Sequence, residues 1–186
     1  VKTINPTNFK GTDLIPAMEN VIKLKNIDLG DLALSYPLFA TIKNNIGFVS
    51  DVAGDGILAV FGLNNENSNS VLDAIQAIKE MNEDLLHFND YLEENFSTKF
   101  GIRAGVHFGD VIVGPFDTGE MKKMAVIGDN VNYASRIESS NKEFNTKVLL
   151  SEEAFQEVKN LYPEYNSFQT TLKGKTGLYK VYEIKL

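Results

Sequence analysis

The chain has 186 residues, enough for one domain with a sizeable core, and its 43% hydrophobic and 23% charged residues are ordinary for a soluble globular protein. It has no cysteine, which excludes disulfides, thiolate metal sites and a cysteine nucleophile. The net charge of -7, without a dense Lys/Arg cluster, argues against polymeric nucleic acid as a partner and leaves a small polyanion open. Because no run approaches the roughly 18 apolar residues of a membrane span and the N-terminus lacks a signal-peptide pattern, we expect a cytoplasmic domain without membrane contact.

The first part of the chain predicts a strand, two helices and a β-hairpin. The strand is expected near residues 3–7, and the helices at 13–25 and 31–44. Apolar alternation over 46–52 and 57–63 flanks an Ala-Gly-Asp-Gly segment. An Asp-Gly pair between such runs is the strongest short-range hairpin signal, so these two strands should pair.

Beyond the hairpin, apolar residues three and four positions apart predict a long amphipathic helix over 70–96. Residues 99–108 and 111–113 alternate as strands, with Gly109-Asp110 at the turn. The later elements expected are a helix over 130–143, a strand over 147–150, a helix over 151–159 capped by Ser151, and closing strands at 167–172 and 178–184. Two βαβ halves around one sheet predict an α+β, ferredoxin-like βαββαβ plan with extra C-terminal strands, and a single domain over residues 1–186.

Three segments, in this order and spacing, resemble the catalytic domain of the class III adenylate and guanylate cyclases. They are residues 52–62 (VAGDGILAVFG), 101–114 (GIRAGVHFGDVIVG) and 126–138 (VIGDNVNYASRIE), of which the third is the most specific. The resemblance covers residues 44–183 clearly and the preceding ones only faintly. It implies the cyclase homology fold and the reaction of that family, in which a nucleoside triphosphate closes to a 3′,5′-cyclic nucleotide and releases pyrophosphate.

The resemblance also implies a site for Mg2+ or Mn2+ on two aspartates of adjacent strands, which suits metals that bind carboxylates and substrate phosphates. Asp55 matches the second aspartate. The segment matching the first, PTNFKGT, places Asn8 there, which offers a carbonyl oxygen without charge. Asp13 is an alternative ligand, or else an early-helix carboxylate favoured by the helix dipole. The substrate-binding residues implied in this segment are Phe9 and Gly11.

Asn132 and Arg136 are four residues apart and therefore share one face of a helix. In the family, the matching asparagine orients the ribose and the arginine stabilises charge on the phosphates, for which its planar fork is suited. The alternative is a surface Arg136 paired with Glu138 or with a neighbouring residue. Lys175 resembles the family's late lysine that reaches the triphosphate. The segment Gly174-Lys175-Thr176 also resembles the end of a P-loop motif. That interpretation is excluded, because residue 169, where the motif has its first glycine, is Gln169.

Two positions that read the base in purine cyclases differ here. The resemblance places Asp51 where those enzymes have lysine or glutamate, and Ala125 where they have a second polar residue. Asp51 cannot donate as an ammonium does, and Ala125 offers no hydrogen bond, so base selectivity must differ. Asp51 as an acceptor suits a cytosine amino group or a guanine edge; alternatively it only faces solvent at a hairpin.

Residues 115–125 fit the family's arm that reaches a second subunit. Cyclase sites form between two chains, with the metal aspartates from one and the Asn/Arg pair from the other. The resemblance therefore implies a head-to-tail homodimer that builds two sites around a two-fold axis.

Two functions follow from these residues. The retained Asn132 and Arg136 favour an active but atypical cyclase for second-messenger signalling. Loss of the purine-reading pair resembles the pyrimidine cyclases of bacterial anti-phage signalling, and a purine cyclase with unusual base contacts fits equally well. The departures at Asn8, Asp51 and Ala125 fit instead a catalytically inactive pseudo-cyclase that binds nucleotide or dimerises as a regulatory module. We favour the enzyme.

Overall fold

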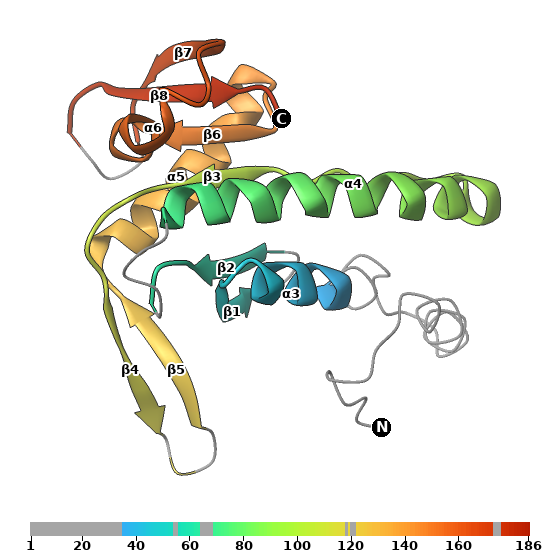
Figure 1. Ribbon diagram of the computed structural model, residues 1–186, viewed down its shortest axis with the longest axis horizontal. Coiled ribbons are helices and arrows are strands. Elements are labelled where there is room, and N and C mark those ends of the chain that lie inside the picture. Colours follow the sequence, from blue (N-terminus) through green and yellow to red (C-terminus); the bar gives the residue numbers. More distant parts are fainter. Residues whose placement is uncertain (1–34, 54–55, 64–68, 118, 120–121, 173–175) are drawn as a thin grey trace.

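The computed structural model describes residues 35–53, 56–63, 69–117, 119, 122–172 and 176–186. Its elements, in chain order, are α3 (Ser35–Asn44), β1 (Phe48–Ala53), β2 (Gly56–Val60), α4 (Ser70–Phe96), β3 (Ala104–Val106), β4 (Ile112–Asp117), β5 (Lys122–Ile127), α5 (Asp129–Phe144), β6 (Val148–Ser151), α6 (Glu152–Val158), β7 (Tyr165–Thr170) and β8 (Tyr179–Ile184). The strand and helix expected at 3–7 and 13–25 lie outside the described residues. Helix α4 crosses the molecule, with α3, β1 and β2 on one side and β6, α6, β7 and β8 on the other (Figure 1).

The long helix α4 has the limits that its sequence pattern predicts. The Asn69 side chain caps its start, where Oδ1 accepts hydrogen bonds from the backbone N–H groups of Val71 and Leu72, both at 3.1 Å. Ser97 adopts the left-handed conformation (φ 51°) at its end and donates its N–H to Glu93 O. None of the described helices is both long and apolar enough to span a membrane.

The main described sheet has the strand order β3-β6-β8-β7. Strand β6 is buried along its whole length and pairs with β3 in parallel and with β8 antiparallel. A strand covered on both faces needs an unbroken apolar run, which Val-Leu-Leu supplies. Strands β1 and β2 pair antiparallel, as do β7 and β8, which confirms both expected pairs with small shifts in their limits.

Gly109-Asp110 lies between two strands, as expected, but these strands do not pair with each other. Strand β3 ends at Val106 and pairs with β6, whereas the next strand, β4, pairs antiparallel with β5. The Gly-Asp segment instead redirects the chain out of the main sheet. The hairpin β4–β5 projects from the rest of the chain (Figure 1), which matches the arm expected at residues 115–125.

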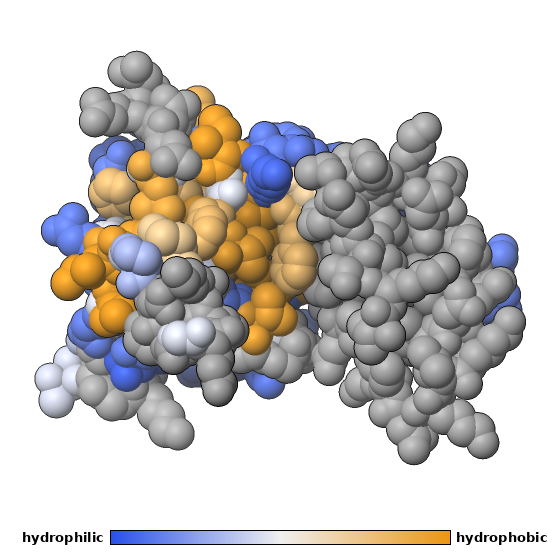
Figure 2. Space-filling model, turned by 90° about the horizontal axis from the view of Figure 1, so that it is seen from below, coloured by the Kyte–Doolittle hydropathy of each residue, from blue (hydrophilic) through white to orange (hydrophobic). Residues whose placement is uncertain are grey.

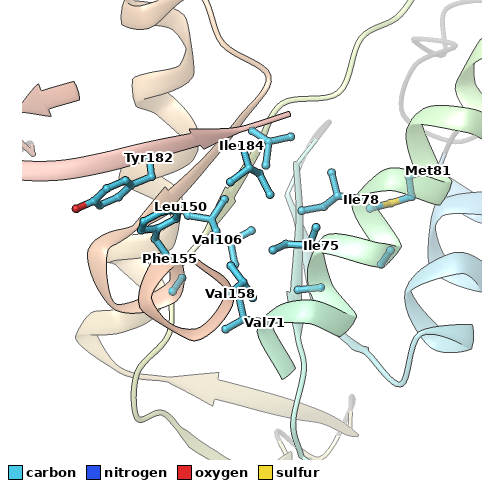
Figure 3. Packing of buried hydrophobic residues seen from close by; sticks show 14 of the residues in the cluster. Val71, Ile75, Ile78, Met81, Val106, Leu150, Phe155, Val158, Tyr182 and Ile184 are labelled. Atoms are coloured by element: carbon cyan, nitrogen blue, oxygen red, sulfur yellow. The ribbon is translucent and has the colours of Figure 1, made fainter. Parts of the chain in front are cut away.

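The core lies between α4 and the main sheet. Figure 3 shows Val71, Ile75 and Ile78 of α4 facing side chains from β3, β6, α6 and β8. Their partners in this cluster include Val106, Leu150, Phe155, Val158, Tyr182 and Ile184. The rings of Phe155 and Tyr182 stack with centroids 4.1 Å apart. This packing fixes the sheet beside which α5 and the hairpin are attached.

Candidate functional site

Helix α5 carries the two residues with the most specific predicted roles, Asn132 and Arg136. Its buried face consists of Tyr133, Ile137, Ser140 and Asn141. At 100° per residue, Asn132 and Arg136 fall together on one flank of that face. Asn132 is exposed there, and Arg136 is half-buried. The sequence spacing therefore places both side chains together, as predicted.

The helix is held close to β3 by a glycine and a buried asparagine. A Cβ on Gly105 would lie 2.3 Å from Glu138 N and 2.6 Å from Ala134 O, both in the α5 backbone. Asn141, which is 0% exposed, donates to Ala104 O at 2.9 Å. These contacts fix the distance of α5 from the sheet and hence the position of its polar flank.

Arg136 has one guanidinium nitrogen, Nη1, that is buried and has no hydrogen-bond partner among the residues that the structure describes. The expected alternative, a surface pair with Glu138, does not form: Glu138 Oε1 lies 3.3 Å from Arg103 Nε instead. A buried cationic donor without an acceptor costs free energy unless a ligand supplies one. Beside the exposed Asn132 amide, such a group can donate a hydrogen bond to an anionic oxygen, such as an oxygen of a phosphate.

The two positions that the resemblance implies for reading the base lie on neighbouring strands. Ala125 is half-buried in β5, opposite Gly114 of β4. Asp51 is exposed in β1, opposite Leu58 and next to a break in register after Val49. Strand β1 contacts β5, and β5 leads through Gly128 into α5. The chain thus joins the Ala125 position directly to the helix of Asn132 and Arg136.

The remaining predicted site residues lie outside the described residues: Asn8, Phe9, Gly11, Asp13, Asp55 and Lys175. The metal ligands expected from the sequence are therefore all among them. Within the described ranges, no group of three or more His, Asp or Glu side chains is arranged to hold a metal ion.

The sequence analysis missed a polar cluster at the start of α5. His107 lies directly after β3, and its ring contacts the Ser151 and Asn130 side chains at 2.9 and 3.0 Å. Tyr133 lies against the same ring, with centroids 4.3 Å apart. Burial, together with nearby Glu153 and then Tyr179, raises the pKa of Tyr133 to about 12. The alternating pattern of residues 99–108 predicted only that His107 lies in a strand. It did not predict the contacts of its side chain with residues far away in the sequence.

A family profile described as the adenylate and guanylate cyclase catalytic domain matches residues 42–185. The chain belongs to this family, whose members are class III nucleotidyl cyclases that generally use divalent metal ions.

Among curated relatives, the adenylate cyclase of Anabaena cylindrica is 32% identical over 151 residues, 75% of this chain and 28% of that protein. A terminal-differentiation adenylate cyclase of Dictyostelium discoideum is 28% identical over 84% of this chain and 8% of that protein. The chain thus spans less than a third of these relatives.

Solved structures confirm the α+β cyclase fold. The adenylyl cyclase CyaB from P. aeruginosa has a TM-score of 0.73 at 19% identity and covers 96% of this chain and 85% of that one. The guanylate cyclase domain of RhGC from Catenaria anguillulae, in complex with GTP, has a TM-score of 0.68 at 21% identity and covers 89% of both chains.

Proposed function

We propose that this chain converts a nucleoside triphosphate into a 3′,5′-cyclic nucleotide and pyrophosphate for second-messenger signalling. The observation that carries the proposal is the Arg136 guanidinium, whose buried Nη1 lacks an acceptor in the described part of the chain, one helical turn from the exposed Asn132. Cyclisation develops negative charge on the α-phosphate and the leaving pyrophosphate. A preorganised arginine stabilises that charge more than it stabilises the bound substrate.

In this reaction Asn132 orients the ribose while Arg136 binds phosphate oxygens. Half-burial of Arg136 raises the strength of its interaction with phosphate, since less water competes for the charge. The divalent ion, held by Asp55 with Asn8 or Asp13, would neutralise the triphosphate and assist ionisation of the 3′-hydroxyl. Lys175 adds a further positive charge for the phosphates.

The base is read by Asp51 in this proposal. Its carboxylate is an acceptor at an exposed position of β1, so it favours a base edge that donates, such as the cytosine amino group or the guanine edge. Uracil has no amino group on that edge, and its N3–H lies between two carbonyl oxygens that repel a carboxylate. We therefore expect CTP or GTP to react faster than UTP.

The test is to incubate the purified protein with ATP, GTP, CTP and UTP separately, with Mg2+ and then Mn2+, and to identify products by mass spectrometry. Arg136→Ala should reduce turnover by about 100-fold or more, as removal of a donor to transition-state charge does elsewhere. The matched control is Lys185→Ala, which removes the same charge from an exposed side chain paired with Glu164 and should leave turnover near the wild-type value. Equal losses in both variants would contradict the role of Arg136.

No product from any triphosphate would instead support a nucleotide-binding module without turnover. In that case Asn8→Asp is the first change to make, because it restores a charged ligand at the first metal position. Activity gained by this variant would assign the inactivity to the metal site.

We also propose that two copies assemble head to tail through the hairpin arm. Ile112 and Ile127 lie opposite each other at its base and are 74% and 63% exposed, and nearby Phe108 is 45% exposed. Figure 2 shows apolar side chains gathered on the side from which the hairpin projects. An apolar patch rimmed by polar residues is typical of a protein interface. Light scattering should give a dimer for the wild type and a monomer for Ile112→Glu, while Leu161→Glu, at a 59% exposed position outside the arm, should remain dimeric.

A further inference from the structure

A buried histidine connects three elements at the start of α5. The His107 side chain is 6% exposed and follows the last residue of β3. Its Nδ1 lies 2.9 Å from Ser151 Oγ, at the N-terminus of α6, and its Nε2 lies 3.0 Å from Asn130 Oδ1, in the first turn of α5. Asn130 Nδ2 in turn donates to Asp110 O at 2.8 Å, in the segment that leads into β4.

The directions of these hydrogen bonds are fixed by the backbone groups at their ends. Asn130 must present its NH2 group to the Asp110 carbonyl, so its Oδ1 faces the ring and Nε2 of His107 must donate. Ser151 Oγ accepts from Ala154 N at 3.1 Å and is free to donate its proton to Nδ1. A ring that donates from Nε2 and accepts at Nδ1 therefore fits its contacts with Asn130 and Ser151, while Glu153 Oε2 lies farther from Nδ1, at 3.7 Å.

The first turn of α5 has no cap of its own. Its N-cap residue is Gly128, which makes no side-chain hydrogen bond, whereas α4 and α6 are capped by Asn69 and Ser151. The first turn of a helix is its least restrained part unless a side chain ties it down. Here that restraint comes from outside the helix, through the contact of Asn130 with His107 and Asp110.

Gly109 leaves the space that this contact requires. A Cβ at this position would lie 2.6 Å from Asn130 Nδ2, 2.9 Å from Asn130 Cγ and 3.2 Å from His107 Nε2. The obstructing atoms belong to the end of a side chain, so an alanine could be accepted by rotating Asn130 away. The hydrogen bonds of Asn130 to His107 and Asp110 would then be lost.

We propose that His107 is a positioning residue for the cyclase reaction, acting through Asn130 to hold the first turn of α5. That turn contains Asn132 and leads directly to Arg136, so its orientation sets where both side chains meet the substrate. The inference rests on the proposed function. Displacing a group that acts on the transition state by about 1 Å costs up to about 100-fold in rate, so loss of this link should lower kcat more than it raises KM.

Two substitutions at His107 separate its two contacts. A glutamine amide reaches the place of the ring Nε2 and keeps the contact with Asn130, whereas an asparagine amide reaches the place of Nδ1 and keeps the contact with Ser151. We expect His107→Asn to lower kcat by about tenfold or more with KM within about twofold, and His107→Gln to stay within about threefold of the wild type. Both variants lose one hydrogen bond and should unfold at similar urea concentrations. Equal loss of kcat in the two variants would refute the inference.

Gly109→Ala tests the same link without changing the histidine. It should lower kcat as His107→Asn does and should change the ring 15N shifts of His107, whose assignment is simple because the only other histidine is His87. Unchanged kcat and ring shifts would overturn the inference. A wild-type chain without turnover would refute the proposed function alone. In that case the backbone amide resonances of Asn132 and Arg136 test the positioning role of His107. They should shift in His107→Asn and stay unchanged in His107→Gln, and the same shifts in both variants would refute the role.

Discussion

The contact between β3 and α5 predicts that Gly105→Ala will damage both stability and activity. The added Cβ would lie 2.3 Å from Glu138 N, 2.6 Å from Ala134 O and 2.8 Å from Glu138 Cα. Ordinary contact begins at 3.4 Å, so α5 would have to withdraw from the strand by about 1 Å. All three atoms belong to the α5 backbone, which cannot move aside as a flexible side chain can.

The two expected losses have different sizes. Overpacking a close contact costs about 1–3 kcal/mol of unfolding free energy, which exceeds the gain of about 0.4–1 kcal/mol from the lower entropy of the unfolded alanine chain. Urea unfolding of Gly105→Ala should therefore give a lower free energy of unfolding than that of the wild type. Because α5 carries Asn132 and Arg136, a shift of about 1 Å should also lower kcat/KM by about 100-fold, which the product assay measures.

Gly101→Ala is the matched control, because a Cβ there meets nothing within 4 Å. It should leave activity unchanged and stability equal or slightly higher. If Gly105→Ala unfolds at the same urea concentration as Gly101→Ala and retains full turnover, α5 does not depend on this close approach, and the reasoning fails.

Three further changes test the packing around the site. Asn141→Leu should lower the free energy of unfolding by about 2–3 kcal/mol, because it removes a buried amide that donates to Ala104 O and accepts from Thr146 Oγ1. A loss no larger than that of a surface substitution would contradict this role. Asn69→Ala should cost about 1 kcal/mol by removing the cap of α4, whereas Asn69→Asp keeps the capping oxygen and should cost less. The raised pKa of Tyr133 favours the neutral phenol in the folded state, so its stabilising effect is complete below pH 10 and is lost as the pH rises through about 12. Burial also raises the pKa of Tyr162 and of Tyr182. Phenolate absorbance should therefore lose its component near pH 12 in Tyr133→Phe; persistence of that component in the variant would assign it elsewhere.

The elements that the sequence predicts well are those with local signals. Helix α4 has the predicted limits because its apolar periodicity and its capping residues agree along the chain. Ser151 caps α6 as expected, with its Oγ accepting from Ala154 N at 3.1 Å. Neither feature depends on contacts between distant segments.

Pairing between distant segments could not be predicted in the same way. Strand β3 pairs with β6, more than forty residues later, for which no local pattern exists. Gly109-Asp110 predicted a turn, and the structure shows that the space left by Gly109 is used by Asn130. Turn residues predict that the chain bends, but they do not predict which strands pair with each other after the bend.

In the candidate site, too, local features were predicted from the sequence and long-range contacts were not. Helical spacing alone places Asn132 and Arg136 on one flank of α5. That Arg136 keeps an unpaired buried nitrogen depends on Glu138 turning to Arg103, which no spacing rule predicts. The contacts of His107 likewise join residues 23 and 44 positions away in sequence.

Helix α4 packs against two separate clusters, so we expect its two ends to differ in local stability. The residues from Val71 to Met81 belong to the main core, whereas Leu92 packs in a small cluster with Phe88, Phe96 and Phe100. Beyond that cluster, two hydrogen bonds between Asn89 and the Phe100 backbone and an exposed ion pair between Glu93 and Lys99 connect this end of the helix to the following segment. Its amides should therefore exchange hydrogen through local opening, while those of the first half exchange only when the whole domain unfolds. One continuous helix thus contains two cooperative units, and a helix of about 40 Å can melt at one end without disturbing the core at the other.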